Sequence, residues 1–164
     1  MRTAVIDSSS LINLVHLQLA NELSLFFDLI YVPRTVQVEV NRKQRFRYRL
    51  QRLYKTGIFE RCTTSDKWRV ELIKAELHEG EAEALILAKE RNAAFFIGDE
   101  RRGREIAEAL ELKPIGTIRI LARLNLESRA EETTKLVRKL RADLRFRVTD
   151  EVVARAIVMA PEPF

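Results

Sequence analysis

Short apolar runs alternate with segments of helical periodicity along the first two-thirds of the chain. The apolar, β-rich runs lie at residues 3–6, 29–32, 58–62 and 95–97, with a brief one near 114–115. Each is short, and all but the run 58–62 are followed by Gly, Pro or Asp, which predicts strands. Strands that alternate with helices predict an α/β fold with three α/β/α layers. Its central sheet is expected to be mostly parallel, with about four to five strands and helices on both faces.

Apolar residues at three- and four-residue spacing predict the helices. Those helices cover about 11–19, 21–27, 33–55 with a break, 66–77, 81–91, 101–110, 116–124, 128–144 and 149–158. Gly80 is expected to separate two of them, and Trp68 is expected to lie in the core. The run from Ser128 to Glu131 forms a capping box, which predicts a helix start at Ser128.

Length and composition predict one globular domain. The chain has 164 residues, of which 46% are hydrophobic and 32% charged, so it is not a disordered polypeptide. We expect a single domain over 1–164, with a core over about 1–124 and a helical C-terminal extension over about 125–164. Cys62 is the only cysteine, which excludes an intrachain disulfide and a Cys-based zinc site. Without a signal-like segment or a long apolar run, the sequence predicts a cytoplasmic protein with no membrane span.

Positive charge changes this picture by indicating a polyanionic partner. The net charge is +5, which favours nucleic acid. Residues 41–55 read NRKQRFRYRLQRLYK, and arginines interleaved with aromatic rings are typical of a surface for single-stranded RNA. We predict RNA contacts from Arg42, Lys43, Arg45, Arg47 and Arg49, and from Arg101, Arg102 and Arg104. The alternative is a solvated helix face whose aromatic residues belong to the core.

Four acidic residues recur where a strand would turn towards a helix, or early in the helix that follows. They are Asp7, Glu39, Glu81 and Asp99. Ligands of open α/β sheets bind outside the carboxyl ends of the strands, so these side chains can converge at one edge. Carboxylates in one cleft repel each other, and a hard divalent cation relieves that repulsion. We therefore predict a Mg²⁺ or Mn²⁺ site that hydrolyses a phosphate ester.

Each acid also has a purely structural interpretation. Asp7 and Asp99 can cap the helices that follow them, and Glu39 can be a surface residue. Glu81 favours the positive end of its helix without any catalytic role. Arg101, Arg102 and Arg104 can neutralise the acidic cluster, or pair with Glu105 and Glu108 on the same helix, rather than bind phosphate. For any single acid, the structural interpretation is about as good as the catalytic one. Four acids in this order nevertheless favour a common site.

Four segments of the chain resemble the PIN-domain ribonucleases, the fold of VapC-like toxin nucleases. They are VIDSSSLINL, YVPRTVQVEV, GEAEALILAKERNAAFFIGDERRGREIA and PIGTIRIL, and the last resembles the Ile-Gly-Thr stretch of one PIN subgroup of poorly assigned function. The likeness spans about residues 4–124. It implies a PIN-like fold and a metal-dependent ribonuclease that leaves a 5′-phosphate and a 3′-hydroxyl.

The resemblance also implies roles for particular residues. Asp7, Glu39, Glu81 and Asp99 would be the catalytic and metal-binding acids. Ser9 would support the site, Glu100 would be an outer ligand, and Glu83 stays open as the alternative third acid. Many members of the family have Asp at that third position. The resemblance further implies a homodimer and, for a toxin, a small antitoxin protein as partner.

Other classes of protein fit the sequence less well. The closest alternative is a catalytically silent PIN-fold module that binds RNA or protein. A haloacid-dehalogenase-like phosphatase needs Asp-x-Asp after the first strand, where this chain has Asp7, Ser8 and Ser9. A response-regulator receiver needs an early acidic pair and a late lysine in an arrangement that this chain lacks. No glycine-rich loop follows the first strand, which excludes P-loop and dinucleotide-binding sites.

Overall fold

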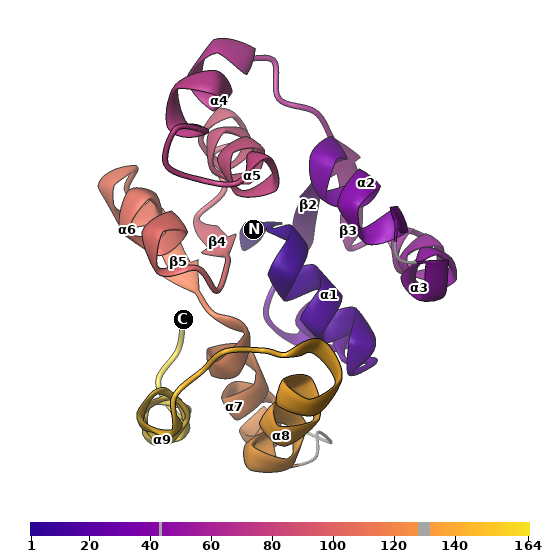
Figure 1. The fold of residues 1–164 in the computed structure, drawn as a ribbon, viewed down its shortest axis with the longest axis vertical. Helices are drawn as coiled ribbons and strands as arrows, with labels where there is room; N and C mark the ends of the chain where they lie inside the picture. Colours follow the sequence, from indigo (N-terminus) through magenta and orange to yellow (C-terminus); the bar gives the residue numbers. More distant parts are fainter. Residues whose placement is uncertain (43, 128–131) are drawn as a thin grey trace. The chain divides into compact units, whose positions relative to one another are not determined.

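Parallel strands form the centre of the fold in the computed structural model, which describes residues 1–42, 44–127 and 132–164 (Figure 1). The strands are β1 (Thr3–Ile6), β2 (Leu29–Pro33), β3 (Phe59–Cys62), β4 (Phe95–Ile97) and β5 (Lys113–Ile115). They form one five-stranded sheet in the order β3-β2-β1-β4-β5, and every neighbouring pair is parallel. The predicted parallel sheet is confirmed.

Helices cover both faces of this sheet. In the unit Met1–Ile115 they are α1 (Ser8–His16), the 3₁₀ helix η1 (Ala20–Leu25), α2 (Arg34–Arg42), α3 (Gln44–Tyr54), α4 (Lys67–Ile73), α5 (Glu79–Glu90) and α6 (Arg101–Ala109). Right-handed crossovers put α1, α2 and α3 on one face and α4, α5 and α6 on the other. Contacts among the helices of each group agree with this assignment, and α2 of the first group also contacts α5 of the second. The three-layer α/β/α prediction is therefore confirmed.

The direction of the chain across the sheet reverses between β1 and β4. From β1 the chain passes through α1 to β2, and from β4 it passes through α6 to β5 on the opposite side. The loops after β1 and β4 therefore lead in opposite directions from the carboxyl ends of these strands, which makes this position a topological switch point. Such a switch point is where open α/β sheets bind their ligands. Helices α1 and α6 also begin at this edge.

Helix α5 is the central helix of its layer and packs against β1, β2 and β4. Every residue from Gly80 to Ala88 is buried. The prediction that Gly80 interrupts the helix is wrong, because α5 begins at Glu79 and includes Gly80 in its first turn. The missing side chain instead allows a close approach, since a Cβ at Gly80 would lie 2.8 Å from Ser8 Oγ.

Helix α4 differs from its prediction in both length and orientation. It ends at Ile73 instead of near residue 77. Trp68, predicted as a core residue, is 71% exposed. The residue of α4 that is buried is Val70, which packs in a cluster with Ala82 and Ile86 of α5. Helical periodicity located the helix correctly, but it could not show which of two apolar stripes faces α5.

The second compact unit, Gly116–Phe164, contains α7 (Thr117–Glu127), α8 (Thr133–Leu144) and α9 (Asp150–Val158). These helices contact each other in all three pairs. Arg123 Nη1 donates to the carbonyl oxygens of Ala160 and Pro161 at 2.9 and 2.6 Å, which holds the end of the chain against α7. The predicted capping box at 128–131 lies outside the described residues. No helix in the described part of the chain is long and apolar enough to cross a membrane.

Candidate functional site

Two aspartates meet at the start of α1. Asp7 follows β1 directly and caps α1, because Ser10 N donates to Asp7 Oδ1 at 2.8 Å and Ser9 Oγ donates to Asp7 Oδ2 at 3.0 Å. Asp99 follows β4 and accepts from Ser10 Oγ at 3.3 Å and from Asn13 Nδ2 at 3.1 Å. Ser10 therefore links both carboxylates. The capping interpretation of Asp7 is correct, whereas the N-cap residue of α6 is Glu100 and not Asp99.

Burial and mutual repulsion make this pair costly to ionise. The side chain of Asp7 is only 1% exposed. That burial and the neighbouring charge of Asp99 raise the pKa of Asp7 from 3.8 to about 7, although the hydrogen bonds from Ser10 and Ser9 lower it. A divalent cation beside the two carboxylates would restore the ionised form of both.

A third acid, Glu81, lies in the first turn of α5. It is 7% exposed, and its Oε2 accepts from His78 N at 3.4 Å. Its other oxygen, Oε1, is buried and has no hydrogen-bond partner among the described residues. Burial raises the pKa of Glu81, and the charges of Glu100 and Glu39 raise it further, against the lowering effect of His78. Glu81 is therefore stabilised by its position at the N-terminus of α5, but only one of its two carboxylate oxygens accepts a hydrogen bond.

Two glycines bring the remaining acids to the same edge. A Cβ at Gly80 would lie 3.1 Å from Glu39 Oε1, and a Cβ at Gly103 would lie 2.8 Å from Glu81 Oε1. Glu39 projects from α2, Glu81 from α5, and Gly103 is part of α6. Glycine at both positions lets the starts of α5 and α6 approach carboxylates that any larger side chain would displace.

The acids form two neighbouring groups and not one compact cluster. Asp7 and Asp99 make the first group, and Glu81 with Glu39 and Glu100 makes the second. Within the described ranges, no three side chains of His, Cys, Asp or Glu lie close enough together to hold one metal ion. The donors that face this edge are carboxylate and hydroxyl oxygens, which suit a hard cation such as Mg²⁺ or Mn²⁺. The Glu81 oxygen without a hydrogen-bond partner and the mutually repelling pair of Asp7 and Asp99 are both consistent with binding such an ion.

Glu83, the alternative third acid, has a different partner. It is buried and accepts from Thr35 N at 2.9 Å and from Thr35 Oγ1 through a short hydrogen bond. Thr35 lies in the first turn of α2, so Glu83 ties α5 to the start of α2. Glu81, for its part, interacts electrostatically with Glu100 and Glu39.

The arginines predicted to bind RNA around α3 fall into separate groups. Arg42, Arg45 and Arg47 are exposed, and Lys43 lies outside the described residues. Arg49 instead donates from Nη1 to Val15 O at 3.1 Å and to His16 O at 3.4 Å. It thus holds the C-terminal carbonyls of α1, which are the groups a helix leaves without internal partners.

The arginines that follow Asp99 are mostly engaged with glutamates. Arg101 Nε donates to Glu105 at 2.9 Å. Arg102 pairs with Glu76 and also with Glu105, at 3.1 Å for the latter. Arg104 is exposed and makes no ion pair within the part of the chain that the structure describes. For Arg101 and Arg102 the structure therefore shows the ion pairing that was the alternative to phosphate binding.

Several polar residues of the site were not singled out from the sequence. Ser10 and Asn13 bind Asp99, and Ser8 Oγ is buried without a hydrogen-bond partner among the described residues. Ser10 and Asn13 carried a signal in the sequence, because they are polar, lie three residues apart and are followed or separated by apolar residues of α1. Thr35 and Gly103 carried no comparable signal, because their roles depend on contacts between distant segments.

Comparison with known proteins agrees with this geometry. Residues 3–162 match a family model described as a PIN domain, which covers nearly the whole chain. Searches of curated proteins and of solved structures found no match. PIN domains are generally nucleases that bind RNA and use divalent metal ions. With a parallel sheet, a switch point lined by acids and a match from end to end, the chain belongs to the PIN-domain family.

Proposed function

We propose that this chain is a metal-dependent endoribonuclease that hydrolyses phosphodiester bonds of single-stranded or structured RNA. The observation that carries the proposal is the pair of Asp7 and Asp99 at the switch point, joined through Ser10. Such a pair is costly without a cation, because both burial and repulsion oppose its ionisation. Glu81 supports the same conclusion through a buried oxygen that has no partner among the described residues.

Each residue has a distinct task in this proposal. Asp7 and Asp99 would hold Mg²⁺ or Mn²⁺, while Glu81 and Glu39 complete the coordination, partly through water. A bound divalent cation acidifies water and offsets charge on the phosphate. Ser9 and Ser10 orient Asp7 through their hydrogen bonds. These bonds fix the carboxylates before RNA arrives, so that no reorganisation is needed during the reaction.

The PIN family further suggests a biological setting for this activity. We propose a cytoplasmic toxin nuclease that forms a homodimer and is inhibited by a small antitoxin protein. The charge of the site supports an inhibitor that inserts an Arg or Lys side chain, because Asp7, Asp99 and Glu81 would each be stabilised by a cation. Glu100, exposed at the start of α6, would contact such a partner or serve as an outer ligand.

A second candidate is a catalytically silent PIN-fold module that binds RNA or protein. The observation that favours it is the spacing of the acids, since no three metal-ligating side chains of the described residues lie within reach of one ion. In this case Asp7 would remain as the cap of α1 and Glu81 as a stabiliser of α5. The two candidates differ in whether the protein cleaves RNA.

Cleavage of a mixed pool of single-stranded RNA separates the two candidates. The purified protein would be assayed with Mg²⁺, with Mn²⁺ and with EDTA, beside Asp7→Asn. Asp28→Asn is the matched control, because Asp28 is exposed and lies before β2, away from the acids. We expect metal-dependent cleavage by the wild type and the control, and none by Asp7→Asn. Cleavage that survives in EDTA or in Asp7→Asn would refute the proposal, and RNA binding without any cleavage would favour the silent module.

A further inference from the structure

The outer face of α3 presents a stripe of cations around one aromatic ring. Arg45, Tyr48 and Arg52 follow each other at intervals of three and four residues, so they share one side of α3, and Lys55 comes directly after the helix ends at Tyr54. All four are exposed, and Tyr48 is 69% exposed. The opposite side is the core face, with Phe46, Leu50 and Leu53 buried. Tyr48 therefore lies on the solvent-exposed side of α3, between cations, and does not pack in the core.

The positive charge of the whole protein is concentrated here. Residues 40–59 contain seven Lys and Arg and no Asp or Glu, whereas the complete chain has a net charge of +5. The rest of the chain is therefore slightly acidic. Within the described ranges, Arg45, Arg52 and Lys55 make no ion pair. Surface charge left without counter-charges in this way indicates a polyanionic partner.

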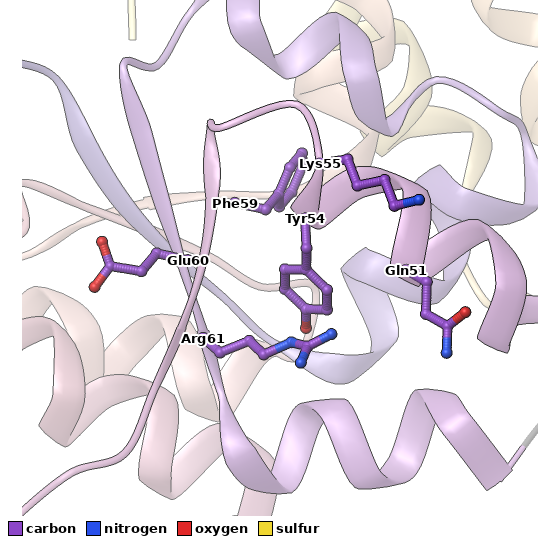
Figure 2. A pocket seen from close by; sticks show the side chains of 6 residues that line it. All are labelled: Gln51, Tyr54, Lys55, Phe59, Glu60 and Arg61. Atoms are coloured by element: carbon purple, nitrogen blue, oxygen red, sulfur yellow. The ribbon is translucent and has the colours of Figure 1, made fainter.

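Hollows flank this stripe on two sides. One, of about 300 Å³, is lined by Tyr48 and Arg52 together with Gln18 and Asn21 near the end of α1. The other, of about 550 Å³, lies between the end of α3 and β3 and includes Lys55 (Figure 2).

In the second hollow an arginine and a tyrosine lie together. The guanidinium carbon of Arg61 is 4.1 Å from the centre of the Tyr54 ring, and the Tyr54 hydroxyl is buried with no hydrogen-bond partner among the described residues. Figure 2 shows Glu60 pointing away from this pair, on the other side of β3. Gln51, Lys55 and Glu60 also line this hollow, so it has two cations, Lys55 and Arg61, and one carboxylate.

This surface lies at the far end of α1 from the acids. Asp7 caps the start of α1, while Arg49 of α3 holds the carbonyls of Val15 and His16 at its other end. Nine residues of helix separate the two ends, which is a distance of about 13 Å. A ligand of the stripe therefore does not reach the acids unless it is longer than a few nucleotides.

We propose that the face Arg45–Tyr48–Arg52–Lys55 is a second RNA-binding surface, for single-stranded RNA, separate from the acidic site. The cations would bind phosphates and Tyr48 would stack on an unpaired base. The stripe is about 15 Å long, which is the length of about four stacked nucleotides. An exposed ring favours single strands, because a duplex keeps its bases stacked inside and offers only phosphates. This inference depends on the proposed nuclease in one respect: the RNA strand that binds this surface is also the strand that the nuclease would cleave.

Binding without cleavage tests this surface first. Fluorescence anisotropy in EDTA would compare a labelled single strand of about 12 nucleotides with the same sequence as a duplex. Tyr48→Ala is expected to weaken binding of the single strand by about 5- to 150-fold, because one stacked base is lost. Tyr48→Phe keeps the ring and should bind as the wild type does. Trp68→Ala is the matched control, an equally exposed aromatic residue on α4.

The outcomes separate this inference from the proposed function. Equal affinity of Tyr48→Ala and wild type, or equal affinity for duplex and single strand, would overturn the inference. In the presence of Mg²⁺ or Mn²⁺, Tyr48→Ala should raise KM for the long strand and leave cleavage of a dinucleotide unchanged. An equal loss on the dinucleotide would also overturn it. If the protein cleaves no RNA at all, the nuclease proposal fails, and the anisotropy result still decides whether α3 binds RNA.

Discussion

The buried aspartate at the start of α1 makes stability depend on pH in a specific direction. Asp7 has a pKa of about 7 in the folded protein and 3.8 as its ordinary value. Below pH 3.8 the carboxyl is protonated in both folded and unfolded states, so it adds no pH dependence. Between the two values the folded protein keeps a proton that the unfolded chain releases, and stability falls as the pH rises. At about 1.4 kcal/mol per pH unit, the total loss is about 4 kcal/mol.

Asp7→Asn isolates this effect because the amide cannot ionise and can still cap α1. Urea unfolding in EDTA would give the free energy of unfolding for both proteins from pH 4 to pH 8. The advantage of Asp7→Asn over the wild type should grow by up to about 4 kcal/mol across that range and level off above pH 7. The difference between the two proteins cancels the titration of groups that do not interact with Asp7, so what remains belongs to Asp7 and to Asp99, which is coupled to it.

Adding a divalent cation extends the same experiment. Mg²⁺ or Mn²⁺ should stabilise the wild type more at pH 8 than at pH 5, because the ion must displace the proton of Asp7. Asp7→Asn should lose most of that gain. A difference between wild type and Asp7→Asn that stays constant with pH in EDTA would refute the reasoning, since it would mean that Asp7 is not a buried carboxyl beside Asp99.

Three further changes test separate contacts. Gly98→Ala should lower stability by about 1–3 kcal/mol in urea unfolding, because a Cβ there would overlap the buried ring of Phe96; unchanged stability would contradict that packing. Glu83→Ala should cost about 1.5–3 kcal/mol, because two donors at the start of α2 lose a charged acceptor, and a cost below about 0.5 kcal/mol would argue against this tie. Arg49→Ala should cost about 1 kcal/mol in thermal or urea unfolding, while the exposed Arg47→Ala should not.

The strands could be predicted because their signal is local. A strand covered by helices on both faces reads as a short apolar run, and β1 with Ala4, Val5 and Ile6 fully buried is such a run. The sheet order follows less directly, since it depends on which strands the crossovers join. Alternation of strands and helices was nevertheless enough to predict that the acids after β1 and β4 share an edge.

Residues whose roles depend on a distant contact could not be predicted in the same way. Arg49 belongs to a basic run, and nothing in that run shows that the end of α1 lies beside it. Trp68 is apolar and correctly spaced for a core position, but α4 turns its other side, with Val70, towards α5. Glycine is a residue type that often ends a helix, but Gly80 lies within α5, at the point where this helix approaches Ser8. In each case a contact with a distant segment, and not the local sequence pattern, determined the position of the residue.

The choice between Glu81 and Glu83 shows why the site itself was harder to predict than the fold. Helix α5 is buried on every side from Gly80 to Ala88, so hydrophobic periodicity cannot assign either glutamate to a face. Two buried carboxylates two residues apart point in different directions, and each must find its own compensation. Glu83 finds it in the donors at the start of α2, whereas Glu81 keeps one oxygen without a partner among the described residues. A buried acceptor left unused is costly to stability, and a ligand that supplies the missing partner is the simplest reason for a protein to retain it.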